Sequence, residues 1–273
     1  MADYTTEELK VYLETAVNIA RTAGKEVQNK FYKKKRTEIK SSLGDPVTET
    51  DKLIEKMFVT TIKEKYPSHR FIGEESTAAG KRTSFTDNPT WIIDPIDGTT
   101  NFVHCLPYVC ISIALVIKQQ VVLGIVYNPM HDLMYTAIKG QGAFCNEDTI
   151  HVSGQEEIGR SLIHASATMS NCEIKLNNMK ALLQAGAGLR YFGCVAEGLC
   201  HVANGSLDAY VDSGFHAWDV AAGALIVEEA GGILLDPTGG PFDLMCRRIL
   251  VASSQNLAST ITPLLTHIEY PKD

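Results

Sequence analysis

Apolar residues near the N-terminus recur three or four positions apart. They are Leu9, Tyr12, Leu13, Ala16, Val17 and Ala20, and the pattern continues to Val27 and Phe31. This spacing places the apolar side chains on one face and predicts a long amphipathic helix. The basic, polar segment that follows, KKKRTEIKSSLGDP, predicts a loop or a short hairpin.

The next part of the chain predicts a second helix followed by a sheet. Thr50 is placed to cap this helix, which should end near Tyr66 and Pro67. Two apolar runs, 109–117 and 121–127, are joined by a short polar turn and predict a hairpin in a buried sheet. Further strands are expected at 71–72, 91–93 and 134–138.

The second half of the chain is less regular. Helices are predicted at 177–183, 196–203, 219–230 and 257–267, and strands at 233–235 and 250–251. Gly231 and Gly232 should close the third of these helices as a C-cap. The pattern predicts a mixed α/β protein with layered sheets and helices. We expect a single domain over residues 1–273, with two sub-domains around one cleft and a boundary near 150.

Composition narrows the choice of ligands. A chain of 273 residues can bury a substantial core, and its 45% hydrophobic and 21% charged residues are typical of a soluble globular protein. The formal net charge of -7 argues against nucleic acid as the main ligand, because clustered Lys and Arg hold phosphate backbones. An acidic protein can still bind a phosphate ester if metal ions supply the positive charge.

Cysteine usage and hydropathy predict a cytoplasmic protein. The seven cysteines form no CxxC pair, which fits a reducing compartment better than a disulfide framework. The N-terminal MADYTTEELK lacks the apolar core of a signal peptide. The longest apolar run is about half of what a membrane span needs. We therefore expect no membrane partner.

The segment WIIDPIDGTTNF, residues 91–102, is the most informative motif. Asp94 precedes a proline, so it is biased towards an extended conformation and should mark the end of its strand. Pro95 carries no donor, which leaves the Ile96 carbonyl as a possible ligand. Asp97 then points back towards Asp94. Carboxylate and carbonyl oxygens are the ligands that Mg²⁺ prefers.

The end of the same motif suits an anion. Gly98 lets the chain approach a ligand closely. If Thr99 opens a short helix, its first amides face the same spot as the carboxylates. A DxxD pair alone is commonly a turn or a helix cap. DPIDGTTN as a unit is far more specific, because each position has its own steric or chemical reason.

Two further acidic segments could complete this site. Glu74 and Glu75 follow a predicted strand, where successive side chains point to opposite faces, so only one can join and we favour Glu74. Asp219 begins a predicted helix and could simply cap it. The apolar GFHAW before it suggests burial, however, and a cation shared with Asp94 and Asp97 would then compensate its charge.

Asp51 lies at the start of the second predicted helix, close to Thr48 and Thr50. It could complement the helix dipole or accept a hydrogen bond from a threonine hydroxyl in the cleft. Other chemistries find less support. The eight histidines lack metal-ligand spacing, no nucleophile elbow is present, and the glycines of 186–193 do not form a dinucleotide fingerprint.

Together these motifs resemble the inositol monophosphatase family of Mg²⁺-dependent, lithium-sensitive phosphatases, and most of all its animal-type members. The matching segments are GEES at 73–76, WIIDPIDGTTNFVH at 91–104, HAWDVAAG at 216–223 and GGPFDL at 239–244. The similarity extends across nearly the whole chain. It implies a layered α/β/α/β/α sugar-phosphatase fold, a homodimer and hydrolysis of myo-inositol monophosphates to inositol and phosphate.

The resemblance also implies two to three Mg²⁺ ions and inhibition by Li⁺. One ion would be held by Glu74, Asp94 and the Ile96 carbonyl. A second would be held by Asp94, Asp97 and Asp219. A third, more weakly bound ion would contact Glu74 through water.

For catalysis, the resemblance implies that Thr99, oriented by Asp51, works with Glu74 to deprotonate the attacking water. The amides of Gly98 and Thr99 would bind phosphate, and Lys40 would lie on a loop beside the site. The implied substrate contacts are Glu74, Ile96, Asp97, Gly98, Thr99, Gly193, Cys194, Val195, Asp212 and Asp219.

The departures from the family lie in the sugar pocket. The family commonly has threonine where Cys194 stands and glutamate where Asp212 stands. Asp212 is one methylene shorter, so its bond to a sugar hydroxyl can become water-mediated. Residues 164–170 also diverge. Three alternatives stay open: a phosphatase of related sugar phosphates or of nucleotide or fructose bisphosphates, a catalytically silent regulatory homologue, and a metal-dependent nuclease.

Overall fold

A seven-stranded sheet forms the centre of the first half of the protein. In this computed structural model the described residues are 4–33, 37–39, 46–80, 85–166 and 171–273. The strand order is β3-β4-β5-β6-β7-β8-β9, with β3 parallel to β4 and the other pairs antiparallel. The bounds are β3 Arg70–Gly73, β4 Thr90–Asp97, β5 Cys110–Ile117, β6 Gln120–Asn128, β7 Leu133–Ile138, β8 Ala143–Cys145 and β9 Asp148–Thr149. The hairpin expected from the two apolar runs is confirmed as β5 and β6.

A five-stranded sheet lies in the second half, in the order β11-β10-β12-β14-β13. Its strands are β10 Leu162–Ala165, β11 Gly188–Arg190, β12 Ala209–Ser213, β13 Ile233–Leu235 and β14 Arg248–Ala252. Residues 150–161 connect the two sheets. A separate antiparallel pair, β1 Thr37–Ile39 and β2 Pro46–Thr48, confirms a hairpin in the basic segment, and the residues between its strands lie outside the described part of the chain.

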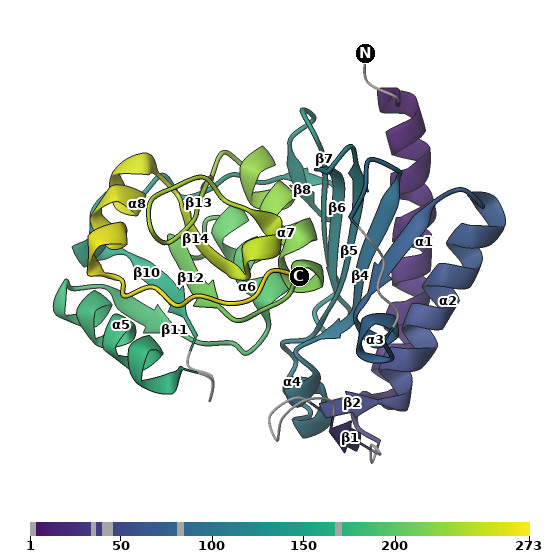
Figure 1. Ribbon diagram of the computed structural model, residues 1–273, viewed down its shortest axis with the longest axis horizontal. Helices are drawn as coiled ribbons and strands as arrows, with labels where there is room; N and C mark the ends of the chain where they lie inside the picture. The colour runs from purple at the N-terminus through teal and green to yellow at the C-terminus, as the bar shows by residue number, and fades with distance from the viewer. Residues whose placement is uncertain (1–3, 34–36, 40–45, 81–84, 167–170) are drawn as a thin grey trace.

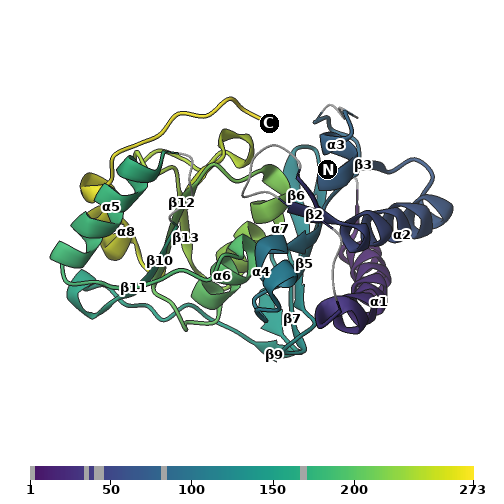
Figure 2. The same ribbon diagram turned by 90° about the horizontal axis from the view of Figure 1, so that it is seen from below.

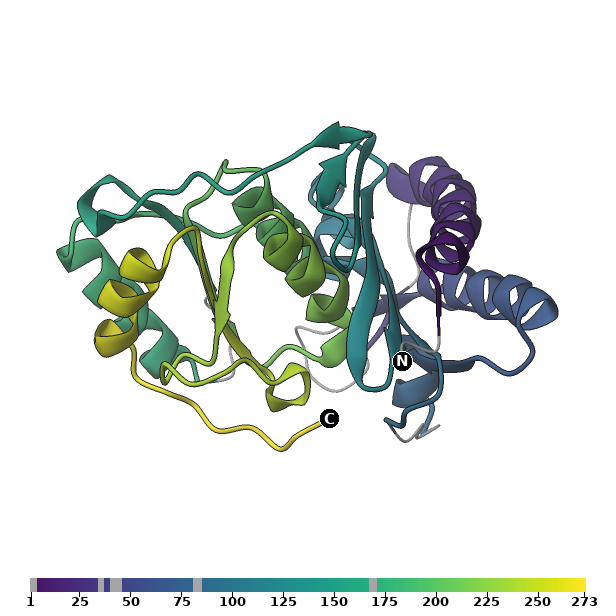
Figure 3. The ribbon, with the colours of Figure 1, turned by 90° about the horizontal axis from the view of Figure 1, so that it is seen from above.

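The helices form three layers around the two sheets (Figure 1). Helices α1 and α2 cover the outer face of the seven-stranded sheet, α6 and α7 lie between the sheets, and α5 and α8 cover the outer face of the five-stranded sheet. The same order is visible from below in Figure 2 and from above in Figure 3. The bounds are α1 Thr6–Phe31, α2 Glu49–Lys65, α3 Glu74–Ala78, α4 Thr99–His104, α5 Cys172–Gln184, α6 Val195–Ala203, α7 Ala217–Glu229 and α8 Gln255–Ile261, with 3₁₀ turns at Ile158–Arg160, Leu244–Cys246 and Thr262–Leu264. The predicted α/β/α/β/α layering is confirmed.

Helix α1 has the amphipathic character that its sequence predicts. Its buried residues form one stripe, and Thr5 and Glu8 make a reciprocal capping box at its start. Helix α7 differs, because almost every residue is buried. It lies between two sheets, so an apolar residue is favourable on either side. Within the described part of the chain, no helix is long and apolar enough to cross a bilayer.

Three sequence predictions of element ends were wrong. Helix α2 is capped by Thr48, not Thr50, because Thr48 and Asp51 form a capping box. Strand β4 continues through Pro95 to Asp97 instead of ending at Asp94. The last helix ends at Ile261, where a 3₁₀ turn containing Pro263 follows.

The tight contact between α7 and β6 generates a stability prediction. A Cβ added at Gly124 would lie 2.6 Å from the Ala222 carbonyl oxygen. We expect Gly124→Ala to lower the free energy of unfolding by about 1–3 kcal/mol, because overpacking forces backbone shifts. Urea denaturation measures the change. Gly159→Ala is the control, since a Cβ there meets no atom within 4 Å. Equal stability of the two variants would contradict this packing.

Candidate active site

Strand β4 places Asp94 and Asp97 at its C-terminal end. Side chains three residues apart on a regular strand point to opposite faces. Here Asp94 pairs with Ser112 and Asp97 pairs with Cys110. The pairing therefore advances by three residues on β4 but by only two on β5. This β-bulge adds one residue and returns Asp97 to the side of Asp94. The proline between them suits a bulge, because it cannot donate to the ladder.

Helix α7 brings a third carboxylate to the same place. Asp219 accepts a hydrogen bond of 2.7 Å from the backbone nitrogen of His216, which fixes it in the first turn. Asp273 also holds this helix end, by accepting from the Ala217 nitrogen at 2.8 Å. One carboxylate oxygen from each of Asp94, Asp97 and Asp219 lies within 4.8 Å of the other two.

Glu74 is the fourth acidic group. Glu74 and Glu75 both lie in α3, which begins at Glu74 directly after β3. The prediction that they continue a strand, on which the choice of Glu74 over Glu75 was based, was therefore wrong. The charge of Glu74 and a hydrogen bond from its side chain raise the pKa of Asp94, which places Glu74 beside that residue. Glu55 supports this turn, because its carboxylate accepts from the backbone nitrogens of Glu75 and Ser76 at 2.7 and 2.9 Å. The sequence alone predicts no role for Glu55.

The electrostatics show that these groups repel one another. Burial raises the pKa of Asp94 strongly, and the charges of Glu74, Asp219 and Asp97 raise it further. Burial likewise raises the pKa of Asp219, with Asp97 and Glu74 adding to the effect. The pKa of Asp97 rises to about 6, mainly through burial, against the opposing hydrogen bond from the Ala196 backbone. Clustered buried carboxylates of this kind fit a hard divalent cation, which prefers oxygen ligands.

Thr99 connects the carboxylate cluster to Asp51. Its hydroxyl oxygen lies 2.9 Å from the Ile96 carbonyl and 3.4 Å from Asp51 Oδ1. The Thr99 hydroxyl can occupy one lone pair of the Ile96 carbonyl, and the second lone pair is left for a cation. Asp51 is fully buried and accepts from the Thr48 backbone nitrogen at 2.9 Å and from the Thr48 hydroxyl.

The turn at Gly193 to Val195 packs directly against Asp97. Cys194 Sγ lies 3.2 Å from Asp97 Oδ2, and the Ala196 backbone nitrogen donates to the same oxygen at 2.5 Å. The backbone of Val195 also donates to Asp97 and lowers its pKa. Two of the implied substrate contacts, Cys194 and Val195, thus border the carboxylate cluster, and Gly193 lies beside Asn101.

Two residues of the DPIDGTTN motif, Gly98 and Asn101, hold this turn against its neighbours. Gly98 has φ +86°, and a Cβ there would lie 2.7 Å from the Tyr108 carbonyl oxygen. Asn101 donates to the carbonyls of Tyr108 at 2.9 Å and Phe192 at 2.7 Å, and so joins the two halves of the protein. Asn101 closes the DPIDGTTN motif, yet its role could not be inferred without knowing which carbonyls face it.

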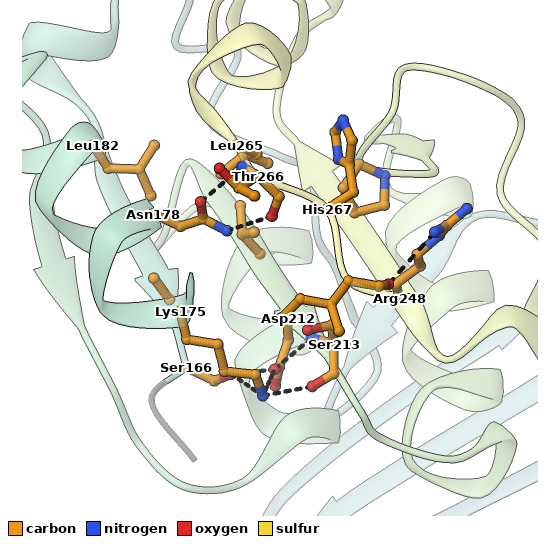
Figure 4. A pocket seen from close by; sticks show the side chains of 14 residues that line it. Ser166, Lys175, Asn178, Leu182, Asp212, Ser213, Arg248, Leu265, Thr266 and His267 are labelled. Atoms are coloured by element: carbon orange, nitrogen blue, oxygen red, sulfur yellow. Dashed lines mark hydrogen bonds and ion pairs between the residues drawn. The ribbon is translucent and has the colours of Figure 1, made fainter. Parts of the chain in front are cut away.

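Asp212 lies in a different network from the other acidic residues. Its Oδ2 accepts from the Tyr210 hydroxyl at 3.0 Å, and its Oδ1 from the Ser213 nitrogen at 2.6 Å and from Ser166. Lys175 Nζ lies 3.6 Å from Oδ1 and donates to the Ser213 carbonyl at 2.6 Å (Figure 4). Lys175 is a buried lysine on a polar helix, and nothing in the sequence indicates its role.

A cavity of about 30 Å³ is bordered by Ser166, Lys175, Asp212 and Ser213. That volume holds a water molecule or two and excludes a sugar phosphate. Two sequence expectations cannot be placed. Lys40 lies outside the described residues, and of segment 164–170 only 164–166 is described.

The fold and the carboxylate cluster together fit a metal-dependent phosphate-ester hydrolase. The model of the inositol monophosphatase family matches residues 8–269, and the chain belongs to this family. Bovine inositol monophosphatase 1 is 49% identical over 96% of each chain. The solved inositol monophosphatase from Anabaena is 30% identical, covers 94% of this chain and 96% of its own, and superimposes with a TM-score of 0.82. The extragenic suppressor protein suhB from Bartonella henselae is 27% identical, with a TM-score of 0.85 and coverages of 93% and 98%. The family implies a divalent metal cofactor.

The crowded carboxylates generate a prediction about stability and metal. When a chelator has removed all divalent metal, we expect Asp94→Asn to be at least as stable as the wild type. The reason is that the amide removes a negative charge from the cluster and so reduces the repulsion. A divalent cation at one hundred times its Kd should stabilise the wild type by about 2.7 kcal/mol and the variant by much less. Denaturant titration with and without Mg²⁺ measures both effects.

Asp148→Asn is the control for that experiment, because Asp148 is an exposed aspartate on the edge strand β9. A full metal-dependent stabilisation of Asp94→Asn would contradict the assignment of Asp94 to the metal site.

Proposed function

We propose that the protein is a Mg²⁺-dependent phosphomonoesterase that hydrolyses myo-inositol monophosphates to inositol and phosphate. The observation that carries the proposal is the convergence of Asp94, Asp97 and Asp219, whose carboxylate oxygens lie within 4.8 Å of one another. Family membership and near-half identity to a full-length inositol monophosphatase support the same reaction.

The metal ligands would be those that the resemblance implies. Glu74, Asp94 and the Ile96 carbonyl would hold one Mg²⁺, and Asp94, Asp97 and Asp219 a second, with a third ion contacting Glu74 through water. Bound ions would neutralise the phosphate, acidify a water molecule and stabilise the leaving alkoxide. Li⁺ would inhibit by replacing the more weakly held ion.

The chain's own residues would orient the attacking water. Thr99 donates its single hydroxyl proton to one acceptor at a time, and both Asp51 and the Ile96 carbonyl are within reach. With the proton directed to Asp51, the lone pairs of the Thr99 oxygen can accept from water. Glu74 would then take the second proton of that water as general base. The buried capping box of Thr48 keeps Asp51 fixed for this role.

Phosphate and sugar would bind on opposite sides of the cluster. The backbone amides of Gly98 and Thr99 would donate to phosphate oxygens. Gly193, Cys194 and Val195 would border the sugar, and Asp219 would accept from one of its hydroxyls. Asp212 already accepts from three protein donors, so it would reach the sugar through its remaining lone pair or through a water molecule.

The departures from the family at Cys194 and Asp212 favour a second candidate substrate class. The resemblance assigns Asp212 and Cys194 to the sugar contacts, and both differ from the residues common in the family, whereas the cluster of Asp94, Asp97 and Asp219 does not include them. Galactose or glucose phosphates are therefore the main alternative to inositol phosphates. Nucleotide and fructose bisphosphates are less favoured by the acidic charge balance.

We also propose a cytoplasmic homodimer. The seven cysteines all lie in the described part of the chain and form no disulfide there, which suits a reducing compartment. Leu106 and Tyr191 are each about half exposed, but single exposed apolar side chains are also common on monomers, so the dimer rests on the family resemblance. Sedimentation equilibrium tests the dimer, and a monomer mass at micromolar concentration would exclude it.

The metal assignment predicts the effect of Asp97→Asn. Loss of this carboxylate should lower kcat/KM for inositol 1-phosphate by more than about 100-fold, because a ligand to the cation is lost. The amide can still accept from the Ala196 backbone, so near-UV circular dichroism should be unchanged. Asp148→Asn serves as the matched control and should retain full activity. Turnover of Asp97→Asn close to the wild type would refute the assignment.

Substrate class and cofactor are tested together by phosphate release. The panel contains inositol 1-phosphate, galactose 1-phosphate, glucose 6-phosphate, a nucleotide bisphosphate and fructose 1,6-bisphosphate. We expect release only with Mg²⁺, fastest from inositol 1-phosphate, and inhibited by millimolar Li⁺. Preference for a hexose phosphate would select the second candidate. No release from any ester would leave a catalytically silent homologue.

A further inference from the structure

A second cluster of possible metal ligands lies behind the carboxylate site. Cys110 begins β5, Cys194 precedes α6, and Glu197 lies in the first turn of α6. The two sulfur atoms and one carboxylate oxygen lie within 4.8 Å of one another. Each of the three residues is only 1% exposed. None of the three acts in the metal site proposed above.

The donors in this cluster differ in kind from those of the catalytic site. Thiolates favour soft or borderline cations such as Zn²⁺ and Cd²⁺, whereas Mg²⁺ favours oxygen. Two cysteines and a carboxylate provide three of the four ligands of a tetrahedral site. Asp97 Oδ2 lies 3.2 Å from Cys194 Sγ, which is near enough for this oxygen to be the fourth ligand or to lie beside the cation.

One carboxylate oxygen of Glu197 has no hydrogen-bond partner among the described residues. Its Oε1 accepts from Asn128 Nδ2 at 2.6 Å, but its buried Oε2 accepts from none of them. Burial raises the pKa of Glu197 to about 7. An unsatisfied buried acceptor costs free energy unless a ligand or water completes it. A bound cation would complete it.

Open space adjoins one member of the cluster. Glu197 lines a cavity of about 350 Å³, which has room for a hydrated ion. His131 and His201 line the same cavity, and imidazole is itself a ligand for Zn²⁺. The cavity therefore connects Glu197 to potential ligands outside the buried cluster.

We propose that Cys110, Cys194 and Glu197 form a binding site for a soft divalent cation such as Zn²⁺ or Cd²⁺, and that a cation bound there inhibits the phosphatase. Binding replaces the two thiol protons, and the carboxyl proton where present, and these protons pass to the buffer. The inhibitory part rests on the proposed function.

Inhibition follows from the position of Asp97. A cation about 2.3 Å from Cys194 Sγ would lie within a few ångströms of Asp97 Oδ2. It would attract this carboxylate away from the catalytic cluster and repel a cation bound there. The two sites would therefore oppose each other through one shared carboxylate.

The experiment titrates the full chain with Cd²⁺ in excess Mg²⁺ and records the near-ultraviolet absorption of cadmium thiolate. The carboxylate site has only oxygen ligands, so it does not contribute to this band. We expect one equivalent per chain in the wild type. Cys110→Ala should abolish the band, and Glu197→Gln should weaken Cd²⁺ binding by at least about tenfold.

Cys172→Ala is the matched control, because Cys172 is an exposed cysteine outside the cluster, and it should leave the titration unchanged. If Cys110→Ala does not fold, Glu197→Gln still tests the site, because it keeps the shape of the side chain. Cd²⁺ binding as tight as in the wild type would then overturn the site. Absence of the band in the wild type, its persistence in Cys110→Ala, or its loss in Cys172→Ala would overturn the site.

Phosphate release tests the inhibitory part separately. Cd²⁺ at one equivalent should slow the Mg²⁺-dependent wild type and leave folded Cys110→Ala unaffected. Equal inhibition of both would place the inhibition at the carboxylate cluster and overturn this part. The absorption titration remains decisive for binding even if no ester is hydrolysed.

Discussion

The active-site region is organised by the repulsion between buried carboxylates. Asp94, Asp97 and Asp219 each have a raised pKa, because burial and neighbouring negative charges disfavour ionisation. Groups of one sign are not held this closely without some compensation. A divalent cation bound among these carboxylates would compensate their charge. The bound cation could in turn hold a phosphate group. The fold therefore maintains a local electrostatic cost that a metal ion offsets.

The scaffold holds these charges in place by backbone devices. The bulge in β4 turns Asp97 towards Asp94, and the capping box of α7 fixes Asp219. The first turn of α6 donates to Asp97 from the other half of the protein. Because the carboxylates belong to β4 and to α7, which packs against that strand, their separation is set by the core. Asn101 adds a direct connection across the same boundary.

Much of this arrangement could be predicted from the sequence, and the failures have a common cause. The layered fold, the first helix and the central hairpin follow from hydrophobic periodicity, and family motifs indicated the acidic residues. The course of β4 through Pro95 could not be predicted, since a bulge depends on pairing with β5. Glu55, Asn101 and Lys175 were missed because each acts on groups distant in sequence. Cys194 was predicted as a substrate contact that departs from the family, and its place beside Cys110 and Glu197 could not be predicted because the three meet only in three dimensions.

The most direct test of the central claim is to locate a cation in crystals. Crystals grown with Mn²⁺ in place of Mg²⁺ would give an anomalous difference map in which the metal stands out from carbon, nitrogen and oxygen. The account predicts peaks among the carboxylates of Asp94, Asp97 and Asp219, with at least one within coordination distance of the Ile96 carbonyl. A map with no peak in this cluster at saturating Mn²⁺ would contradict it.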